Sequence, residues 1–197
     1  MTEPDAVAEW DAEAAAYDEP ADHGLLDPDV REQWRRLLVG LLPPPPARVA
    51  EMGSGTGTLS VLLADEGYEV DGVDFSPEMV RRAVAKAAGR DGVRFVEADA
   101  SRPPLTNGAY DAVLCRHVLW AMPDPAAALR GWVDLLADGG TLVLVEGRWG
   151  NGAGLDADRT VALVEDTGRR AELTRLHDAV YWGREIDDDR YVVVSRS

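Results

Sequence analysis

Short apolar runs alternate with helically spaced apolar positions along most of this chain. The runs predict strands, and apolar positions that recur about once per helical turn predict helices between them. We expect strands at residues 49–51, 68–74, 93–98, 110–115, 141–146 and 191–195, and helices at 28–41, 57–64, 75–88, 123–136 and 157–164. This alternation, with short links rich in turn residues, is typical of a parallel sheet covered by helices on both faces.

The expected organisation is a single domain over residues 1–197, which is long enough to bury a core of its own. Prolines at 43–46 form a stiff spacer because each ring fixes the backbone φ angle. They separate an N-terminal part, residues 1–42, from a strand–helix core at 47–149. Residues 150–197 form a third part, which ends in the strand expected at 191–195.

A turn with three alternate glycines follows the first expected strand. The strand ends at Glu51, and Gly53, Gly55 and Gly57 leave little side-chain bulk before the next helix. A ligand can therefore approach the backbone N–H groups and the helix N-terminus. Dinucleotide-binding turns place their third glycine three positions after the second, where this chain has Thr58. The spacing predicts a different ligand-binding turn, and the alternative is an ordinary glycine-rich turn.

An acidic residue also ends the second expected strand. Asp74 lies 21 residues after Gly53, close to the offset of roughly 20 residues at which nucleotide-binding βαβ units place a carboxylate for ribose. Two carboxylate oxygens can accept hydrogen bonds from two neighbouring hydroxyls. The spacing favours a ribose-binding role for Asp74, and the alternative is an N-cap of the helix that opens at Phe75.

The ordered set of Glu51, Gly53, Asp74 and Asp99, with the turn at 136–140, resembles the motifs of class I S-adenosylmethionine (SAM) methyltransferases. The resemblance runs from about residue 10 to residue 149. It implies a three-layer α/β sandwich with a mostly parallel seven-stranded sheet, an antiparallel last strand and helices on both faces. The partner of that last strand should then lie within residues 172–181.

The same resemblance implies that SAM is the cofactor and that residues 47–149 hold it. Asp99 and Ala100 match the family's adenine clamp, and the alternative for Asp99 is a plain turn residue. Residues 1–42 match a lid and a helix, with Tyr17 covering the methionine half of SAM unless it packs in the core. The cofactor-binding residues expected from the family are Tyr17, Glu51, Gly53, Ser54, Gly55, Asp74, Phe75, Met79, Asp99, Ala100, Cys115 and Arg116.

The methyl acceptor is expected between the lid, the ends of the fourth and fifth strands, and the C-terminal part on the substrate side. Trp120, Arg148 and Trp149, with Trp182, would form an aromatic pocket with one cation, which suits a planar or apolar small molecule. The alternative is that the tryptophans are core residues and Arg148 is solvated. His117 follows a strand end and is the candidate general base, with a hydrogen-bonded scaffold role as its alternative.

Composition narrows the range of partners. The formal net charge is −16, from 36 acidic and 20 basic residues, so nucleic acids and anionic membranes would be repelled. The single cysteine, Cys115, excludes an internal disulfide and is simply explained as a small core residue. His23, His117 and His177 show no metal-ligand spacing, so no metal is expected. An acidic N-terminus and the lack of a long apolar run favour a cytoplasmic protein, whose oligomeric state the sequence leaves open.

These observations predict a SAM-dependent methyltransferase that acts on an oxygen or nitrogen atom of a small molecule. One alternative is a SAM-binding protein without activity that serves as the partner of another protein. A second alternative is a nicotinamide-dependent oxidoreductase on a similar sheet, against which the glycine spacing counts. The cofactor motifs of an inactive partner would look the same, so only turnover separates it from an enzyme.

Overall fold

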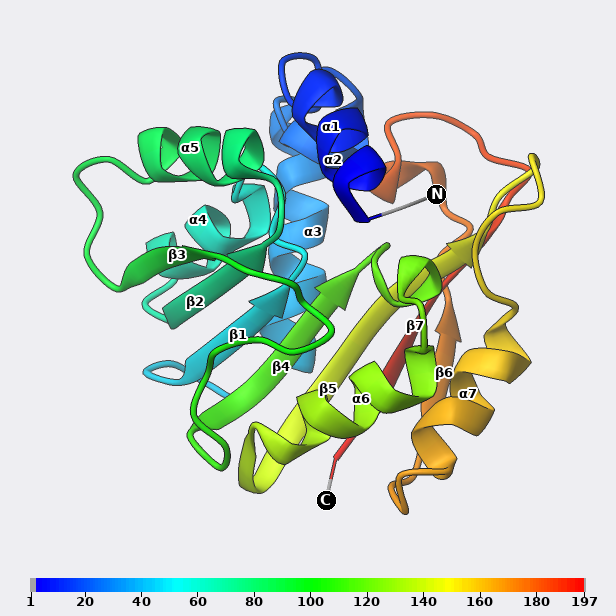
Figure 1. The fold of residues 1–197 in the computed structure, drawn as a ribbon. Helices are drawn as coiled ribbons and strands as arrows, with labels where there is room; N and C mark the ends of the chain where they lie inside the picture. Colours follow the sequence, from blue (N-terminus) through cyan, green and yellow to red (C-terminus); the bar gives the residue numbers. More distant parts are fainter. Residues whose placement is uncertain (1–2, 197) are drawn as a thin grey trace.

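Seven strands form one sheet in the computed structural model, which describes residues 3–196 (Figure 1). The strands are β1 (Arg48–Met52), β2 (Glu69–Asp74), β3 (Val93–Glu97), β4 (Tyr110–Arg116), β5 (Leu136–Arg148), β6 (Glu172–Arg175) and β7 (Asp189–Ser195). Their spatial order is β3-β2-β1-β4-β5-β7-β6, and β7 runs antiparallel to both of its neighbours. The predicted sheet is confirmed, and so is the position of the last strand's partner within residues 172–181.

Seven α-helices and two short 3-10 helices join the described strands. They are α1 (Glu3–Glu13), α2 (Ala21–Gly24), α3 (Pro28–Leu41), α4 (Thr58–Asp65), α5 (Pro77–Lys86), η1 (Leu119–Ala121), α6 (Pro125–Asp134), α7 (Ala157–Glu165) and η2 (Ala179–Tyr181). Three of them begin with a proline directly after a capping side chain, at Asp27, Ser76 and Asp124. None of these helices is both long and apolar enough to cross a membrane.

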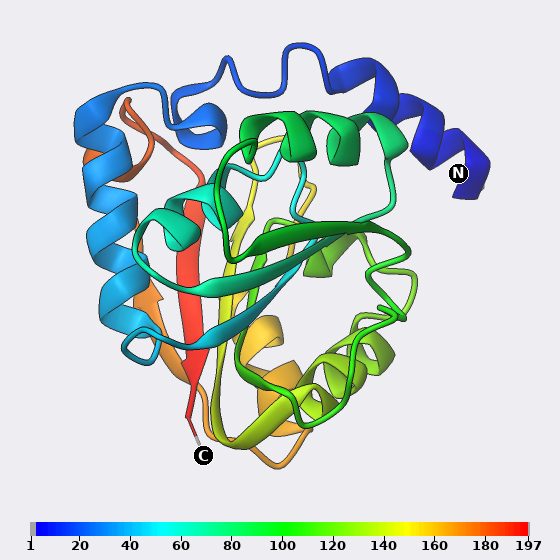
Figure 2. The ribbon, with the colours of Figure 1, turned by 90° about the vertical axis from the view of Figure 1, so that its left-hand side faces the viewer.

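Helices α3, α4 and α5 cover one face of the sheet, and α6 and α7 cover the other (Figure 2). Side chains alternate along β1, so Val49 joins the core under α3 and α4 whereas Ala50 joins the core under α6. The chain winds in one direction from β1 to β3 and then returns to β4 on the far side of β1. This reversal places the ends of β1 and β4 side by side, where open α/β sheets bind ligands.

The boundary between α6 and β5 differs from the sequence prediction. A helix to residue 136 and a strand from 141 are expected, with the turn at 138–140 between them. Instead α6 ends at Asp134 and β5 begins at Leu136. The pairing with β4 shifts register between Tyr110 and Ala112, so the glycine turn is an irregularity within the strand.

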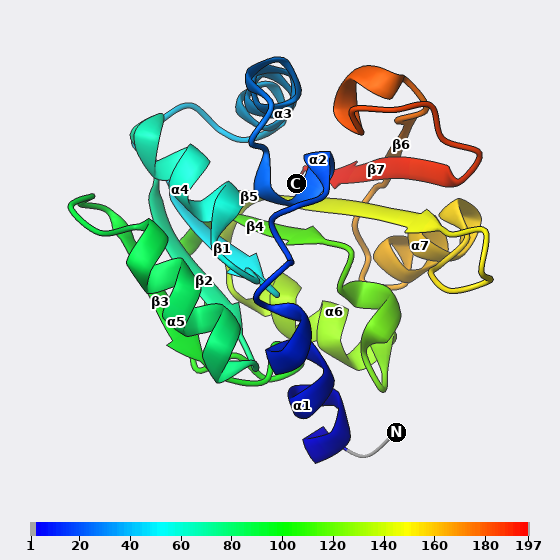
Figure 3. The ribbon, with the colours of Figure 1, turned by 90° about the horizontal axis from the view of Figure 1, so that it is seen from above.

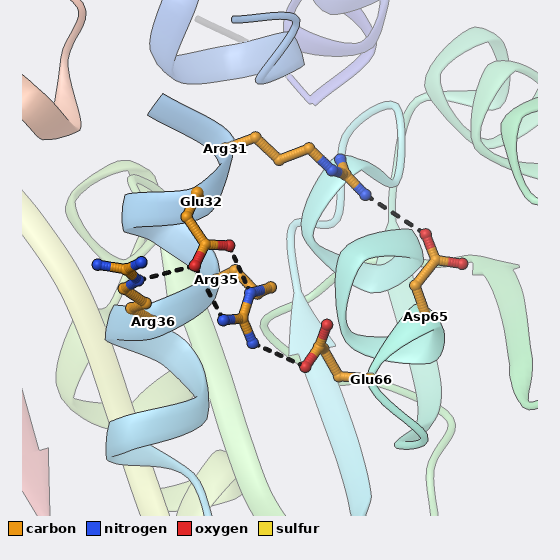
Figure 4. A network of polar contacts seen from close by, with 6 residues as sticks. All are labelled: Arg31, Glu32, Arg35, Arg36, Asp65 and Glu66. Carbon is orange, nitrogen blue, oxygen red and sulfur yellow. Dashed lines mark hydrogen bonds and ion pairs between the residues drawn. The ribbon is translucent and has the colours of Figure 1, made fainter. Parts of the chain in front are cut away.

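A network of charged side chains holds α3 beside the end of α4 (Figure 4). Arg35 bridges Glu32 of its own helix, at 2.6 Å, and Glu66 beyond α4, at 3.0 Å. Arg31 reaches Asp65 at 3.4 Å. These groups are partly or fully exposed to solvent, so the network helps to orient α3 but adds little stability.

The N-terminal segment crosses the edge of the sheet at which β1 and β4 end (Figure 3). Asp11 of α1 accepts hydrogen bonds from the Ser76 hydroxyl at 2.5 Å and from the backbone N–H of Glu78 at 3.1 Å, which attaches α1 to the start of α5. Asp18 accepts a hydrogen bond from Thr56 at 2.5 Å and pairs with Lys86 at 2.8 Å. Two separate contacts therefore hold this segment over the glycine turn and α5.

Candidate functional site

The glycine turn adopts a backbone shape that other residues rarely take. Gly53, Gly55 and Gly57 have φ angles of +69°, +53° and +76°. A Cβ on Gly53 would lie 2.2 Å from a methyl group of Val118, so this turn also packs closely on the loop after β4. A bulkier residue is excluded both by the positive φ and by the lack of space.

Asp74 organises this turn through both of its carboxylate oxygens. One oxygen accepts from the backbone N–H of Gly55 at 2.8 Å, and the other accepts from that of Ser76 at 2.9 Å. Ser76 is the N-cap of α5, since its hydroxyl accepts from the N–H of Met79. The alternative of Asp74 as the helix cap is therefore wrong.

A small cavity of about 10 Å³, room for roughly one water molecule, lies between the glycine turn and the N-terminal segment. Its lining residues are Tyr17, Glu51, Gly53, Ser54, Thr56, Thr58, Leu59 and Arg116. Glu51 is 3% exposed and accepts a hydrogen bond from Ser60, and burial raises its pKa to about 7. The Ser54 hydroxyl is buried without a hydrogen-bond partner within residues 3–196. The cavity thus offers a buried carboxyl, a guanidinium and an unused hydroxyl to a ligand.

Tyr17 lines this cavity rather than the core. Its ring stacks on His23 at a centroid distance of 4.6 Å and meets Trp10 edge-on at 6.1 Å. A Cβ added to Gly55 would lie 3.2 Å from the Tyr17 ring, so the tyrosine rests directly on the turn. This position fits the covering role that the sequence predicts, and the contacts of Asp18 hold it there.

The remaining residues expected to bind the cofactor differ in how far they are buried. Asp99 is exposed, and its carboxylate accepts from the backbone N–H and the hydroxyl of Ser101 at 2.8 and 2.6 Å. Phe75 is half-buried, and Met79 and Ala100 are buried. None of these four residues lines the cavity beneath Tyr17, and neither does Cys115, which is fully buried in the core under α6. Its alternative as a core residue explains its position.

His117 has an unusual backbone and an unusual environment. Its φ is +60°, a value that costs free energy in a non-glycine residue and is often found at functional sites. Its ring stacks on Trp182 at 6.1 Å and meets Trp149 edge-on at 5.1 Å, and its Nε2 atom is buried with no partner among the described residues. Burial, with the nearby charges of Arg116 and Arg190, holds the pKa of His117 well below its usual value. The imidazole is therefore neutral, and such a low pKa makes it a weak general base.

Glu146, which the sequence analysis did not select, fixes the loop after β4. One of its oxygens accepts from the backbone N–H groups of Val118 and Leu119 at 3.1 and 2.8 Å. The side chain is fully buried, and burial raises its pKa to about 8. The sequence feature that could have identified Glu146 is an acidic residue at the end of an otherwise apolar strand. Through this loop Glu146 positions Trp120, whose indole N–H donates to the His117 carbonyl at 2.9 Å.

The acceptor side contains a different cation from the one expected. Trp120 and Trp149 do pack together, at 5.5 Å. Arg148, however, is exposed and pairs with Asp156 at 3.5 Å. Arg190, at the start of β7, is instead 5% exposed, with its guanidinium 5.3 Å from the Trp149 ring and 4.7 Å from the Trp182 ring. Sequence reasoning missed Arg190 because it stands beside an acidic run that suggests a solvated turn.

Within residues 3–196, no group of three or more His, Cys, Asp or Glu side chains is arranged to hold a metal ion. His177 lies on the surface, with Nε2 at 3.2 Å from Asp189. His23 lies in the N-terminal segment beside Tyr17. The absence of a metal from the reaction stays a prediction.

The chain matches the model of a family described as a methyltransferase domain, over residues 50–144. It is 41% identical over 118 residues to a demethylmenaquinone methyltransferase from Thermus thermophilus, covering 58% of this chain and 54% of that protein. It is 38% identical over 107 residues to a ubiquinone biosynthesis O-methyltransferase from Xanthomonas campestris, covering 51% and 43%. The chain thus spans about half the length of the curated relatives it matches.

The fold is also similar to that of a SAM-dependent methyltransferase from Aquifex aeolicus. The TM-score is 0.73 at 16% sequence identity, with 94% of this chain and 97% of that chain covered. At this identity the similarity concerns the fold alone. The matched sequence region includes the glycine turn, Asp74, Asp99 and His117, which are the residues that gather at the edge of the sheet.

Proposed function

We propose that this chain, which belongs to the class I SAM-dependent methyltransferases, transfers a methyl group from SAM to an oxygen or nitrogen atom of a small molecule. The observation that carries the proposal is the set of residues around the water-sized cavity beneath Tyr17, which SAM could enter only after Tyr17 moves away. It brings together the glycine turn and two side chains of opposite charge, Glu51 and Arg116.

The cavity residues fit the parts of SAM. The amino-acid end of SAM carries an ammonium and a carboxylate, for which Glu51 and Arg116 are the complementary groups. The buried hydroxyl of Ser54 has no partner among the described residues and adds a further hydrogen-bonding group. Asp74, at the end of β2, would accept from the ribose hydroxyls, and Asp99, after β3, would lie on the adenine side, although neither lines the cavity itself.

Methyl transfer from SAM mainly requires that the acceptor atom is positioned close to the methyl group and that water is excluded. SAM supplies a methyl group that its sulfonium already activates. Tyr17 and the segment that carries it close the cavity, and the contact of Asp18 with Lys86 holds them closed. Trp120, Trp149 and His117 form the wall on which a planar acceptor would lie.

The proposed function predicts stabilisation by the cofactor. Saturation with SAM or S-adenosylhomocysteine, at about 100 times the dissociation constant, should raise the free energy of unfolding by about 2.7 kcal/mol without added metal. Thermal melts in the presence of SAM, S-adenosylhomocysteine or NAD measure this. A response to NAD but to neither SAM nor its product would overturn the proposal.

Cofactor binding alone does not separate an enzyme from an inactive partner protein. Turnover does, and incubation of the protein with methyl-labelled SAM and a panel of small phenols, acids and amines measures it. Label transferred to any member above the protein-free control supports the enzyme. Stabilisation by SAM without transfer to any compound in the panel would favour the inactive partner. The cytoplasmic location expected from the sequence stays a prediction.

The raised pKa of Glu51 predicts that SAM affinity depends on pH. Burial keeps this carboxyl protonated below about pH 7, with an opposing contribution from the Arg116 charge. The ammonium of SAM pairs with the ionised form, so affinity should fall as pH decreases through 7, by about tenfold between pH 8 and pH 6. Titration calorimetry at the two pH values measures the change.

A Glu51→Gln variant is the control for this pH effect. It should bind SAM more weakly at pH 8 and lose the dependence between pH 6 and pH 8. Burial holds the pKa of both His23 and His117 below the usual histidine value, whereas Glu146, with a pKa raised to about 8, also titrates between pH 6 and pH 8. A full pH dependence that persists in Glu51→Gln would assign the effect to another group.

A further inference from the structure

We propose that Arg190 and His117 form the binding site for an anionic oxygen on a planar ring, which makes the acceptor an aromatic or quinone-like compound with an ionised phenol or carboxylate. The inference rests on the proposed function, because it concerns the acceptor of that reaction. The carrying observation is that two buried nitrogens, Arg190 Nε and His117 Nε2, have no hydrogen-bond partner within residues 3–196 and lie against the same two indole rings.

Arg190 is buried but incompletely bonded. Its NH2 group pairs with Asp188 at 2.9 Å, and its NH1 group lies 3.9 Å from Asp22, a distance too long for a hydrogen bond. The Nε–H donor has no partner among the described residues. A buried donor without a partner costs free energy, and the cost is larger when the donor belongs to a charged group. A ligand oxygen would recover this free energy.

The sheet is shaped to place Arg190 at this position. Gly147 of β5 lies opposite Arg190 of β7 in the antiparallel pair. A Cβ on Gly147 would lie 2.7 Å from the Arg190 Cδ and 3.0 Å from the backbone oxygen of Asp189. The arginine side chain therefore crosses β5 over the glycine and reaches the tryptophan rings. A larger residue at 147 would push it away.

His117 supplies the second donor. Its backbone N–H donates to the Val145 carbonyl at 2.9 Å, which fixes the residue at the end of β4 despite its φ of +60°. The charges of Arg116 and Arg190 disfavour protonation, so the ring stays neutral. A neutral imidazole with hydrogen on Nε2 can donate to the same oxygen that Arg190 contacts.

The surroundings of these two nitrogens select for a flat ligand. Trp149 and Trp182 contribute aromatic faces, and the guanidinium of Arg190 lies over both. An anionic oxygen attached to an aromatic ring satisfies the two donors and packs its ring against the indoles. Asp22 of the N-terminal segment disfavours a second negative charge at the far side of Arg190. A ligand with a single ionised oxygen group fits best.

The position of this pair connects it with the cofactor cavity. Arg116, the neighbour of His117 in β4, lines that cavity and donates to the Asp22 carbonyl at 2.5 Å. A single residue step, from Arg116 at the end of β4 to His117 directly after it, thus separates the cofactor side from the anion-binding pair. Asp22 contacts both arginines, so closure of the N-terminal segment covers the two sites together.

Calorimetry on the protein saturated with S-adenosylhomocysteine tests the inference at pH 8. The probes are benzoate against benzamide, and 4-nitrophenolate against nitrobenzene, so that each anion has a neutral counterpart of similar shape. We expect at least one anion to bind about tenfold more tightly than its counterpart. The pair that shows this preference distinguishes a carboxylate from a phenolate.

Three variants test which residues cause the preference for the anionic probes. Arg190→Lys keeps the positive charge but removes the Nε–H donor, and it should abolish most of the preference for the anion. Arg148→Gln removes an exposed arginine of the same strand end and should leave the preference unchanged. His117→Phe keeps an aromatic ring without Nε2 and should reduce the preference as well, which provides a second test if Arg190→Lys does not fold.

The following outcomes would contradict the proposed anion-binding site. Equal binding of anions and neutral probes, or no binding of any probe at millimolar concentration, would overturn it. Loss of the preference in Arg148→Gln but not in Arg190→Lys would also overturn it. Failure of S-adenosylhomocysteine itself to bind would contradict the proposed function, so the two failures are distinguishable.

Discussion

A Gly55→Val variant should lose detectable binding of SAM while remaining folded. Residue 55 has a φ of +53°, and a Cβ there would lie 3.2 Å from the Tyr17 ring that covers the cavity. A left-handed backbone costs a β-branched residue about 1–2 kcal/mol, so the turn would rearrange and its N–H would lose the bond to Asp74. Titration calorimetry with SAM and S-adenosylhomocysteine measures the loss.

Gly89→Val is the matched control for this variant. Gly89 also has a positive φ, +81°, but it lies beyond the end of α5, and a Cβ added there would meet no atom within 4 Å. It should therefore incur a similar backbone strain without any effect on SAM affinity. Equal affinities of the two variants for SAM would show that the glycine turn does not form the cofactor site.

An Asp74→Ala variant should weaken SAM binding by about 10- to 150-fold, the equivalent of 1.5–3 kcal/mol for hydrogen bonds to a charged group. The change removes the proposed ribose acceptor and also leaves the N–H groups of Gly55 and Ser76 without their carboxylate. The melting temperature should therefore fall as well. Calorimetry gives the affinity, and a thermal melt gives the stability.

Asp27→Ala separates these two effects. Asp27 caps α3 through the N–H of Asp29 at 2.8 Å, and α3 packs on the sheet away from the cofactor cavity. Its loss should cost about 1 kcal/mol of stability and leave SAM affinity unchanged. If Asp74→Ala behaves like Asp27→Ala, with wild-type affinity, then Asp74 only supports the turn.

The sequence by itself determined the order of strands and helices and the edge of the sheet at which we propose that the cofactor binds. Gly53, Gly55, Asp74 and Glu51 could be found because each follows or ends a strand, and parallel strands bring their carboxyl ends to one edge. A short motif of this kind depends on local backbone geometry, which neighbouring residues specify. The cap of α5 is also a local feature, but the sequence offered both Asp74 and Ser76 for it. The hydrogen bond from the N–H of Met79 to the Ser76 hydroxyl shows that Ser76 is the cap.

Only the tertiary structure decided which charged side chain lies beside the tryptophans on the proposed acceptor side. Arg148 and Arg190 lie at the ends of two paired strands, and nothing in their local sequence tells which one is buried. The antiparallel register places Arg190 opposite Gly147, so that side chain crosses to Trp149 and Trp182, while Arg148 faces solvent and Asp156. Glu146 is a similar case, because its partners are N–H groups from a loop 27 residues earlier in the chain. Contacts between distant segments depend on register and on how loops fold over the sheet, and these are settled by packing of the whole domain rather than by any local pattern.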